Sequence, residues 1–311
     1  MTAPSPATSR AAGLAALALV FNALVWGTSW WPFRFLQAAG LHPLWATAII
    51  FTLASLVIVA ARPRALGQVL TTPTLWLLVV AAGTTNAAFN WAVVIGDVVR
   101  VVLLFYLMPL WTVLLARIVL HERFTAAAAL RIGLALAGAA IVLRPESAAP
   151  ESLATLAAHL PLPRSLPDWL GVVGGFSFAF NNVMLRREAD RPEEGRALAM
   201  FVGGAIVAGA LAGALTGSGQ VPWLPAPAAA WLLPPAVLTV VFLAGNLLLQ
   251  YGAARLPANR TAVVMLTEVV FASASAVAFG GGTLTARLAL GGGLIVASAL
   301  LAALTPAERL S

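Results

Sequence analysis

Polar residues inside apolar segments recur in this chain at a constant separation of 160 residues. Asn86 and Asn90 lie four residues apart in one apolar segment. Asn246 and Gln250 lie four residues apart in another, each 160 positions after its counterpart. Across residues 125–139, eight of fifteen residues are identical to those 160 positions later. The chain is therefore built from a duplicated unit, and an internal repeat in a membrane protein is typical of a transporter.

The composition places both units in a membrane. Of the 311 residues, 61% are hydrophobic and 9% are charged, and the mean hydropathy is +0.94. A soluble domain has about 25% charged residues, because its surface faces water. The apolar segments lack the strict alternation of membrane β-strands, so we expect membrane helices of about 20 residues each. The ten predicted spans are 13–33, 43–61, 75–96, 99–119, 126–143, 169–186, 197–216, 231–254, 259–279 and 285–304.

The longest polar connection divides the ten spans into two groups of five. We expect an all-α integral membrane protein in which residues 1–143 form a first five-helix repeat, residues 144–168 a central periplasmic loop and residues 169–311 a second five-helix repeat. An odd number of spans makes the second copy enter the membrane in the opposite orientation. The two repeats (5+5) are therefore predicted to be inverted around a central cavity. A duplication that only builds a stable bundle is the alternative.

The distribution of the 18 arginines predicts the orientation in the membrane. With a cytoplasmic N-terminus, thirteen of them fall on the cytoplasmic side and five on the other. Arginine is enriched in cytoplasmic loops, so both termini are predicted to be cytoplasmic. Because the arginines flank the spans and do not form one patch, we expect no nucleic-acid partner. The five outer arginines are Arg34, Arg100, Arg144, Arg164 and Arg287.

The two amide pairs are candidate substrate-binding groups. Asn86 and Asn90 share one helix face, as do Asn246 and Gln250. Because an unpaired amide in hydrocarbon costs several kcal/mol, these faces should point inward. There the amides either offer donors and acceptors to the amino and carboxylate groups of a zwitterion, or join the helices by hydrogen bonds.

Glu268 is the only carboxylate near the middle of a predicted span. An acid at that depth is costly and is a candidate functional group by default. We expect it to bind a substrate ammonium or to carry a coupling proton, and a paired structural acid is the alternative. Its counterpart 160 positions earlier is Met108, so the repeat does not decide between these roles.

The first span carries a cluster of tryptophans followed by Pro32. Trp26 and Trp30 lie one turn apart on one face, and Pro32 permits a kink. Such rings suit the wall of a cavity for an aromatic side chain or a cation, although tryptophan is also an interfacial anchor. The sixth span, the counterpart of the first, offers Phe178 and Asn182. We place all four of these aromatic and amide residues in the predicted substrate site, with Pro32 as a hinge.

Tyr106 and Tyr251 are the only two tyrosines, and each lies inside a predicted span. A hydroxyl at that depth suits a substrate contact, whereas a single aromatic side chain also serves as packing. We include both in the predicted substrate site. Pro109 lies inside the fourth span, where it removes a backbone hydrogen bond and predicts a second hinge.

The chain lacks the sequence motifs of enzymes, metal sites and channels. The three histidines, His42, His121 and His159, lie in or near loops, and neither HExxH nor GxSxG occurs. The chain has no cysteine, so thiolate metal sites are excluded. We therefore expect no enzyme, no metal site and no cofactor. A channel would need a ring of charges or a filter-like segment, and neither is evident.

Three short runs match a known family. They are Trp-Gly-Thr-Ser at 26–29, Leu-Met-Pro at 107–109 and His-Glu-Arg-Phe-Thr at 121–125, with Gly133 following. Together with the repeat, they resemble the drug/metabolite transporter superfamily in its EamA-type branch, over nearly the whole chain. Within it, the many tryptophans and the long central loop are most similar to the YddG-type exporters of aromatic and other amino acids.

The second repeat departs from this pattern in two places. Three glycines at 280–282 stand where the first repeat has Leu-His-Glu at 120–122, and Val269 stands where the first repeat has Pro109. We therefore expect no symmetric gate built on the loop glutamate.

The resemblance implies a secondary transporter that exports amino acids by alternating access, with broad specificity and a preference for aromatic and apolar ones. Export would run from cytoplasm to periplasm across a bacterial inner membrane. An exporter of another metabolite, a nucleobase or a cationic drug is the alternative, and coupling to protons is open. The expected partners are an amino-acid substrate and the lipid bilayer. A ten-helix inverted pair is self-sufficient, so we expect a monomer.

Overall fold

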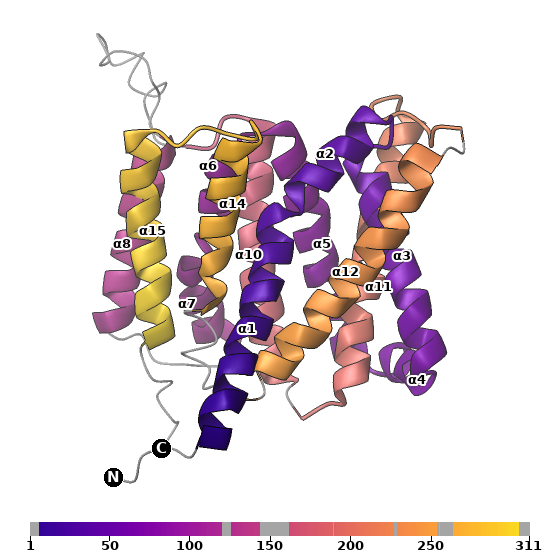
Figure 1. The fold of residues 1–311 in the computed structure, drawn as a ribbon, viewed down its shortest axis with the longest axis horizontal. Coiled ribbons are helices and arrows are strands. Elements are labelled where there is room, and N and C mark those ends of the chain that lie inside the picture. Colours follow the sequence, from indigo (N-terminus) through magenta and orange to yellow (C-terminus); the bar gives the residue numbers. More distant parts are fainter. Residues whose placement is uncertain are drawn as a thin grey trace.

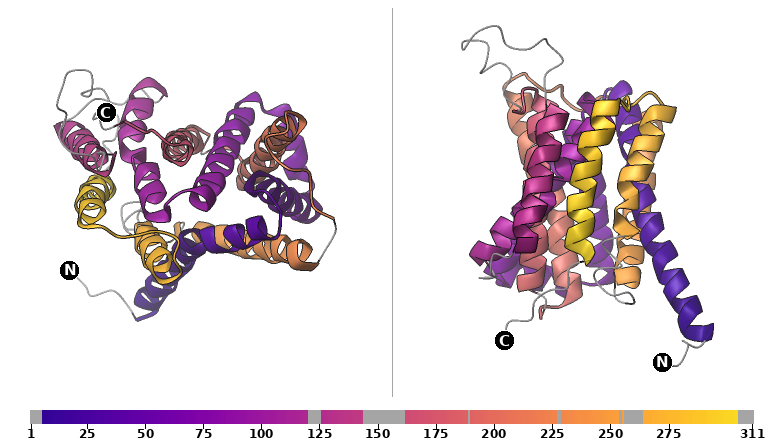
Figure 2. Two further views of the ribbon diagram at one scale, coloured as in Figure 1. Left: turned by 90° about the horizontal axis from the view of Figure 1, so that it is seen from above. Right: turned by 90° about the vertical axis from the view of Figure 1, so that its left-hand side faces the viewer.

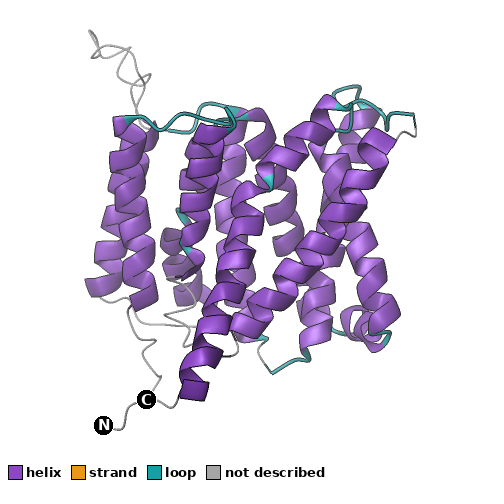
Figure 3. Ribbon diagram, viewed as in Figure 1, coloured by secondary structure: helices purple, strands orange, loops and turns teal. Residues whose placement is uncertain are grey.

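The computed structural model describes residues 6–119, 126–143, 162–188, 190–226, 229–253, 255 and 264–304. Within these ranges the chain is helical, with turns and short connections and no strand (Figure 3). The helices before the central connection are α1 (Pro6–Thr28), α2 (Trp30–Ala38), α3 (Pro43–Ala61), α4 (Arg64–Thr71), α5 (Pro73–Ile95), α6 (Val98–Phe105), α7 (Met108–Val119) and α8 (Ala126–Leu143). Those after it are α10 (Leu166–Arg187), α11 (Glu193–Gly217), α12 (Ala229–Ala253), α14 (Thr267–Ala278) and α15 (Ala286–Leu304).

Six helical stretches among the described residues are long and apolar enough to cross a membrane. Three shorter apolar helices and the more polar α10 occupy the positions of the other four predicted spans. The chain is therefore a helical multi-pass membrane protein. The six long stretches are Gly13–Ala38, Pro43–Ala61, Pro73–Ile95, Val98–Val119, Glu193–Gly217 and Trp231–Leu249.

The first predicted span is interrupted at Ser29, between α1 and α2. Pro32 has no backbone N–H, so the carbonyl of Thr28 lacks its usual partner one turn later. The Ser29 hydroxyl donates to the Trp26 carbonyl at 2.8 Å, a local bond that competes with regular helix bonding. The kink expected from Pro32 is thus present, and it lies three residues before the proline.

Two further helix breaks lie 160 residues apart. The break between α6 and α7 includes Tyr106, three residues before Pro109, and a turn residue, Leu266, precedes α14. Pro109 explains the first break, because it cannot donate to the carbonyl one turn earlier. In the second half Val269 occupies the proline position, and its N–H donates to the Leu266 carbonyl at 3.1 Å. A helix break therefore lies at the equivalent position in both halves, although only one half has the proline.

The helices of the two halves interleave (Figure 1). α10 packs against α5, α6 and α7, whereas α1 packs against α12 and α14. α11 packs against α3 and α5, and α3 also contacts α12. α8 and α15 pair at one edge of the bundle (Figure 2). The middle of the bundle is therefore enclosed by helices from both sides of the central connection.

Glycines allow two of these helix pairs to approach closely. A Cβ atom on Gly83 of α5 would collide with the carbonyl group of Gly203 in α11. One on Gly138 of α8 would lie 2.5 Å from the carbonyl oxygen of Gly291 in α15. Small residues at helix interfaces permit this contact between backbones in a membrane, where dispersion contacts largely replace the hydrophobic effect.

Candidate functional site: a central cavity

A cavity of about 140 Å³ lies midway along the bundle, between helices of both halves. A single buried water needs roughly 10–15 Å³ on this scale, so the cavity has room for a small organic molecule. Six phenylalanines form much of its apolar wall: Phe51, Phe89, Phe105, Phe178, Phe201 and Phe242. Its polar lining residues are Asn22, Thr85, Asn86, Asn181, Asn246 and Glu268.

The aromatic wall is held in two groups. Trp26 of α1 stacks on Phe242 of α12, with ring centroids 4.8 Å apart and planes inclined by 13°. Phe105 lies 4.8 Å from Phe89 and 5.3 Å from Phe178, so it joins α6 to α5 and α10. Aromatic pairs at these separations contribute more than their buried area alone. The cavity thus offers flat apolar surfaces on two sides.

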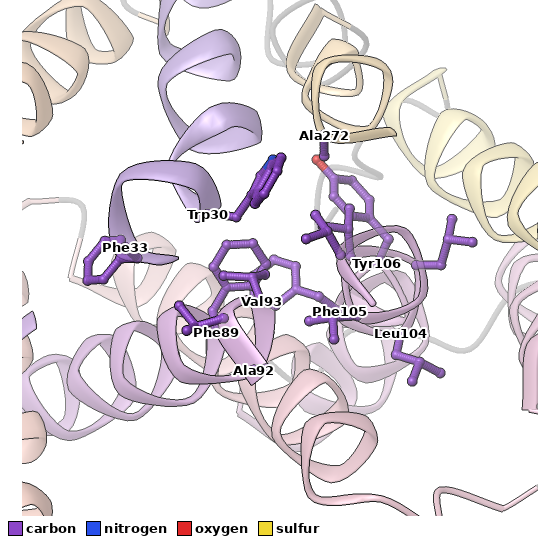
Figure 4. Packing of buried hydrophobic residues seen from close by; sticks show 14 of the residues in the cluster. Trp30, Phe33, Phe89, Ala92, Val93, Leu104, Phe105, Tyr106 and Ala272 are labelled. Atoms are coloured by element: carbon purple, nitrogen blue, oxygen red, sulfur yellow. The ribbon is translucent and has the colours of Figure 1, made fainter. Parts of the chain in front are cut away.

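Glu268 and Tyr106 meet across the bundle. Glu268 lies in the first turn of α14, just after the break at Leu266, where the positive end of the helix dipole favours a negative charge. The Tyr106 hydroxyl donates to the Glu268 carboxylate at 3.3 Å. Figure 4 shows this hydroxyl pointing toward the helix that carries Ala272, which is α14. A hydrogen bond between Tyr106 and Glu268 therefore joins the two equivalent helix breaks.

Two of the lining amides have their nitrogens bound to backbone carbonyls. Asn22 Nδ2 donates to the Gly245 carbonyl at 2.9 Å and joins α1 to α12. Asn86 Nδ2 donates to the Ala82 carbonyl one turn earlier in its own helix, at 2.8 Å. Both bonds fix the orientation of the amide, because a carbonyl can only accept. Each amide keeps its oxygen and one further N–H for other partners.

Five of the residues predicted from sequence lie in the cavity wall: Trp26, Asn86, Phe178, Asn246 and Glu268. Tyr106 is buried and reaches the cavity through Glu268. The side chains of Gln250 and Pro109 lie outside the described part of the structure. The role of each of these residues in binding a substrate is a proposal.

Four other predicted site residues do not line the cavity. Asn90 is fully buried and donates to the Thr47 hydroxyl at 3.1 Å. This hydrogen bond joins α5 to α3, which is the alternative role considered for the amides. Trp30 is buried one turn beyond Trp26. Asn182 is partly buried beside Asn181, the amide that does line the cavity. Tyr251 carries the Arg255 guanidinium 3.8 Å above its ring, near the end of α12.

The cavity ends at a packed layer on the side away from the chain termini. On α1, Asn22 and Trp26 line the cavity, and Trp30 donates from its indole N–H to the Ser275 hydroxyl at 2.9 Å. On α5, the lining stops at Phe89, and Val93 one turn later is only 1% exposed. These buried side chains form a layer between the cavity and that end of the bundle.

Arg34 forms hydrogen bonds with the helix connections at the end of the bundle beyond that layer. Its guanidinium donates to the carbonyls of Gly96 at 2.6 Å, Gly281 at 3.2 Å and Val93 at 3.3 Å. Asp97 accepts the Thr283 N–H at 2.9 Å, which brings the α5–α6 and α14–α15 connections together. Arg34 and Asp97 thus hold this end closed.

An ion pair lies at the same end. Arg100 donates two hydrogen bonds to Asp168, at 2.7 and 3.0 Å, and a third to the Val142 carbonyl at 2.7 Å. A bidentate arginine–carboxylate pair is stronger than a single-contact pair. It ties the start of α6 to the start of α10 and the end of α8. Arg260, the repeat counterpart of Arg100, lies outside the described residues.

Sequence reasoning missed several residues of the wall. Asn22 is a polar residue inside an apolar segment, and that signal alone could have identified it. The phenylalanines carry no such signal, because an apolar ring in an apolar helix reads as ordinary packing.

Comparisons with known proteins agree with this architecture. Residues 13–144 match the EamA-like transporter family. A solved crystal structure of a protein, 20% identical in sequence, aligns with a TM-score of 0.54 over 93% of this chain and 96% of its own. At that identity the likeness concerns the fold alone. Among curated proteins, none matches this chain. The part of the chain that is similar to EamA-like transporters therefore runs from within α1 to the end of α8.

Proposed function

We propose that this chain is a secondary transporter that exports small molecules carrying an amine and an apolar body. Apolar and aromatic amino acids are among them, and export runs from cytoplasm to periplasm by alternating access. The observation that carries the proposal is the central cavity, in which aromatic walls from both halves surround a single carboxylate, Glu268. The EamA-like domain at residues 13–144 supports transport as the class of activity.

We also propose that the fold is ten spans in two inverted five-helix repeats. The helix contacts support this arrangement, because several of the main ones are preserved when the halves are exchanged. Exchanging α1 with α10, α5 with α12 and α7 with α14 converts the α10·α5 and α10·α7 contacts into α1·α12 and α1·α14. The α11·α3 and α15·α8 contacts map onto themselves. Two similar halves of this kind can exchange conformations around a fixed site.

The closed end of the bundle supports the proposed direction of transport. Arg34, Asp97 and Arg100 hold together the end of the bundle opposite the chain termini. With both termini in the cytoplasm, as the arginine distribution predicts, this closed end faces the periplasm. The structure then corresponds to the state in which substrate enters from the cytoplasm.

A cationic drug is the second candidate substrate. Glu268 favours it, because the cavity wall holds a carboxylate while its described lining residues include no arginine, lysine or histidine. A cation also gains from the faces of Trp26 and the surrounding phenylalanine rings.

Counterflow into liposomes containing the purified chain tests the proposed function. We expect accumulation of labelled phenylalanine or of labelled tetraphenylphosphonium, reduced by Trp26→Ala, which removes an aromatic wall. Tyr251→Phe is the matched control, since it alters an aromatic residue away from the cavity. Failure of both labelled compounds to accumulate would contradict the proposal.

A further inference from the structure

We propose that the cavity recognises a protonated amine and discriminates against a carboxylate, so that an arylalkylamine binds more tightly than the amino acid with the same side chain. This inference rests on the proposed transport function and narrows its substrate class. It is carried by the charge of the cavity wall, which includes the Glu268 carboxylate and, among the described lining residues, no cationic side chain.

Asn22 is one of the residues of the cavity wall. Its nitrogen donates to the Gly245 carbonyl, so the amide cannot flip without placing two oxygens against each other. The side chain is 1% exposed, and its Oδ1 has no hydrogen-bond partner within the protein. A buried acceptor without a partner costs free energy, which a ligand N–H would recover.

Thr85 and Asn86 of α5 follow the same pattern. The Thr85 hydroxyl donates to the Ala81 carbonyl at 2.9 Å, and Asn86 Nδ2 donates to the Ala82 carbonyl. A hydroxyl has a single proton to donate, so Thr85 keeps only lone pairs for a ligand. Asn86 likewise has its oxygen free to accept.

Two further acceptors complete the polar wall. Asn181 of α10 is 1% exposed, and its Oδ1 also lacks a hydrogen-bond partner within the protein. The Glu268 carboxylate accepts the Tyr106 hydroxyl on one oxygen and has lone pairs remaining. Residues with acceptor oxygens therefore line the cavity from α1, α5, α10 and α14.

An ammonium group matches this wall. It brings three N–H donors and a positive charge, which Glu268 can balance. A substrate carboxylate would bring only acceptors and a negative charge. The described lining residues include no cationic side chain to receive it, and a buried unpaired charge is expensive. A site whose buried groups demand a particular partner rejects analogues that lack it.

Four ligands with one aromatic body separate these chemistries: phenethylamine, phenylalanine methyl ester, phenylalanine and 3-phenylpropionate. Each competes with labelled phenethylamine for the purified full chain in liposomes. We expect the two amines without a carboxylate to compete best, phenylalanine at least about tenfold more weakly, and phenylpropionate not at all.

Two variants test the acceptors themselves. Glu268→Gln removes the charge with little change in shape, and Asn181→Leu removes an acceptor oxygen. Both should reduce the ratio of phenethylamine to phenylalanine affinity. Asn182→Leu, at the neighbouring position outside the cavity wall, should leave that ratio unchanged. This ratio responds to recognition and not to a uniform loss of folded protein.

The outcomes distinguish a failure of the proposed amine preference from a failure of the proposed transport function. If phenylalanine competes as well as phenethylamine, the discrimination is absent and the inference is overturned, while the proposed transport function stands. If none of the four ligands competes or accumulates, the inference and the proposed function both fail. Unchanged affinity ratios in Glu268→Gln and Asn181→Leu would also overturn the inference.

Discussion

The hydroxyl of Tyr106 donates to the carboxylate of Glu268 at 3.3 Å, across the interface between the two halves of the chain. Each residue lies at or beside a helix break, and the two breaks are 160 positions apart. This contact therefore couples the shape of one repeat to the charge carried by the other.

Tyr106→Phe should weaken binding of phenethylamine without unfolding the protein. The ring stays in its packed position, and only the hydrogen bond that orients Glu268 is lost. A hydrogen bond to a charged group contributes about 1.5–3 kcal/mol, so we expect roughly a tenfold rise in Kd. Equilibrium binding at one pH measures the effect, with the thermal transition as a check on folding. Unaltered affinity would show that the hydroxyl does not position Glu268.

Glu268→Gln should abolish any dependence of transport on a pH gradient. A carboxylate that exchanges a proton for a substrate ammonium couples the two fluxes, whereas an amide cannot be protonated in this range. We expect the wild type to accumulate more tetraphenylphosphonium, a cation with no titratable group, when the side opposite the substrate is acidic. The variant should accumulate equal amounts with and without the gradient. A gradient response that survives in Glu268→Gln would assign coupling to another group.

Gly138→Ala should destabilise the protein, while Gly133→Ala on the same helix should not. A Cβ at Gly138 would lie 2.5 Å from the Gly291 carbonyl oxygen, but one at Gly133 meets nothing within 4 Å. Overpacking of this kind costs about 1–3 kcal/mol, whereas alanine in an open helical position stabilises by up to about 1 kcal/mol. Thermal unfolding in one detergent compares the two. Equal transitions would mean that α8 and α15 can separate freely.

Arg34→Ala should open the closed end of the bundle. The substitution removes three hydrogen bonds to the carbonyls of Val93, Gly96 and Gly281. Because the chain has no cysteine, Val93→Cys supplies a unique label for a membrane-impermeant thiol reagent. We expect faster labelling of Val93→Cys from the periplasmic side when Arg34 is replaced. Identical labelling rates would show that the buried layer closes this end without Arg34.

His42 should make the protein less stable in mild acid. It caps α3 by accepting the Leu44 N–H on Nδ1, and burial lowers the pKa of its imidazole below 6.5. The unfolded chain then binds the proton more readily, so the stabilisation is full above about pH 6.5 and is lost as the pH falls below it. His42→Asn keeps a capping side chain but does not titrate. The fall in transition temperature between pH 7.5 and 5.5 should be smaller in this variant, and an equal fall would exclude His42.

The sequence was sufficient for the helical architecture because its signals are long and periodic. Apolar segments separated by arginine-flanked connections predict spans, and the 160-residue offset reappears in the two helix breaks. The depth of a residue along its helix was harder to predict. Asn86 and Asn90 share a face one turn apart, yet one lines the cavity and the other bonds to Thr47. Periodicity gives the face of a helix, whereas the neighbour at each level depends on tertiary packing.

Trp26 and Trp30 illustrate the same limit. They lie on one face of the first span, but the interruption at Ser29 separates a ring in the cavity wall from a ring in the packed layer. The phenylalanines of the wall come from several helices that are distant in sequence. Only their convergence around one space distinguishes them from ordinary core residues.

The two bends differ in whether they can be undone. Pro109 has no backbone N–H, so the bend at Tyr106 cannot straighten into a continuous helix. At Leu266 the corresponding N–H belongs to Val269, which now donates to the carbonyl three residues back and can shift to the one four residues back. The helix break in the first repeat is thus fixed, whereas the helix break in the second repeat is reversible. Straightening the second break would carry Glu268 away from an unmoving Tyr106, so a carboxylate could release its cargo through motion in one half alone.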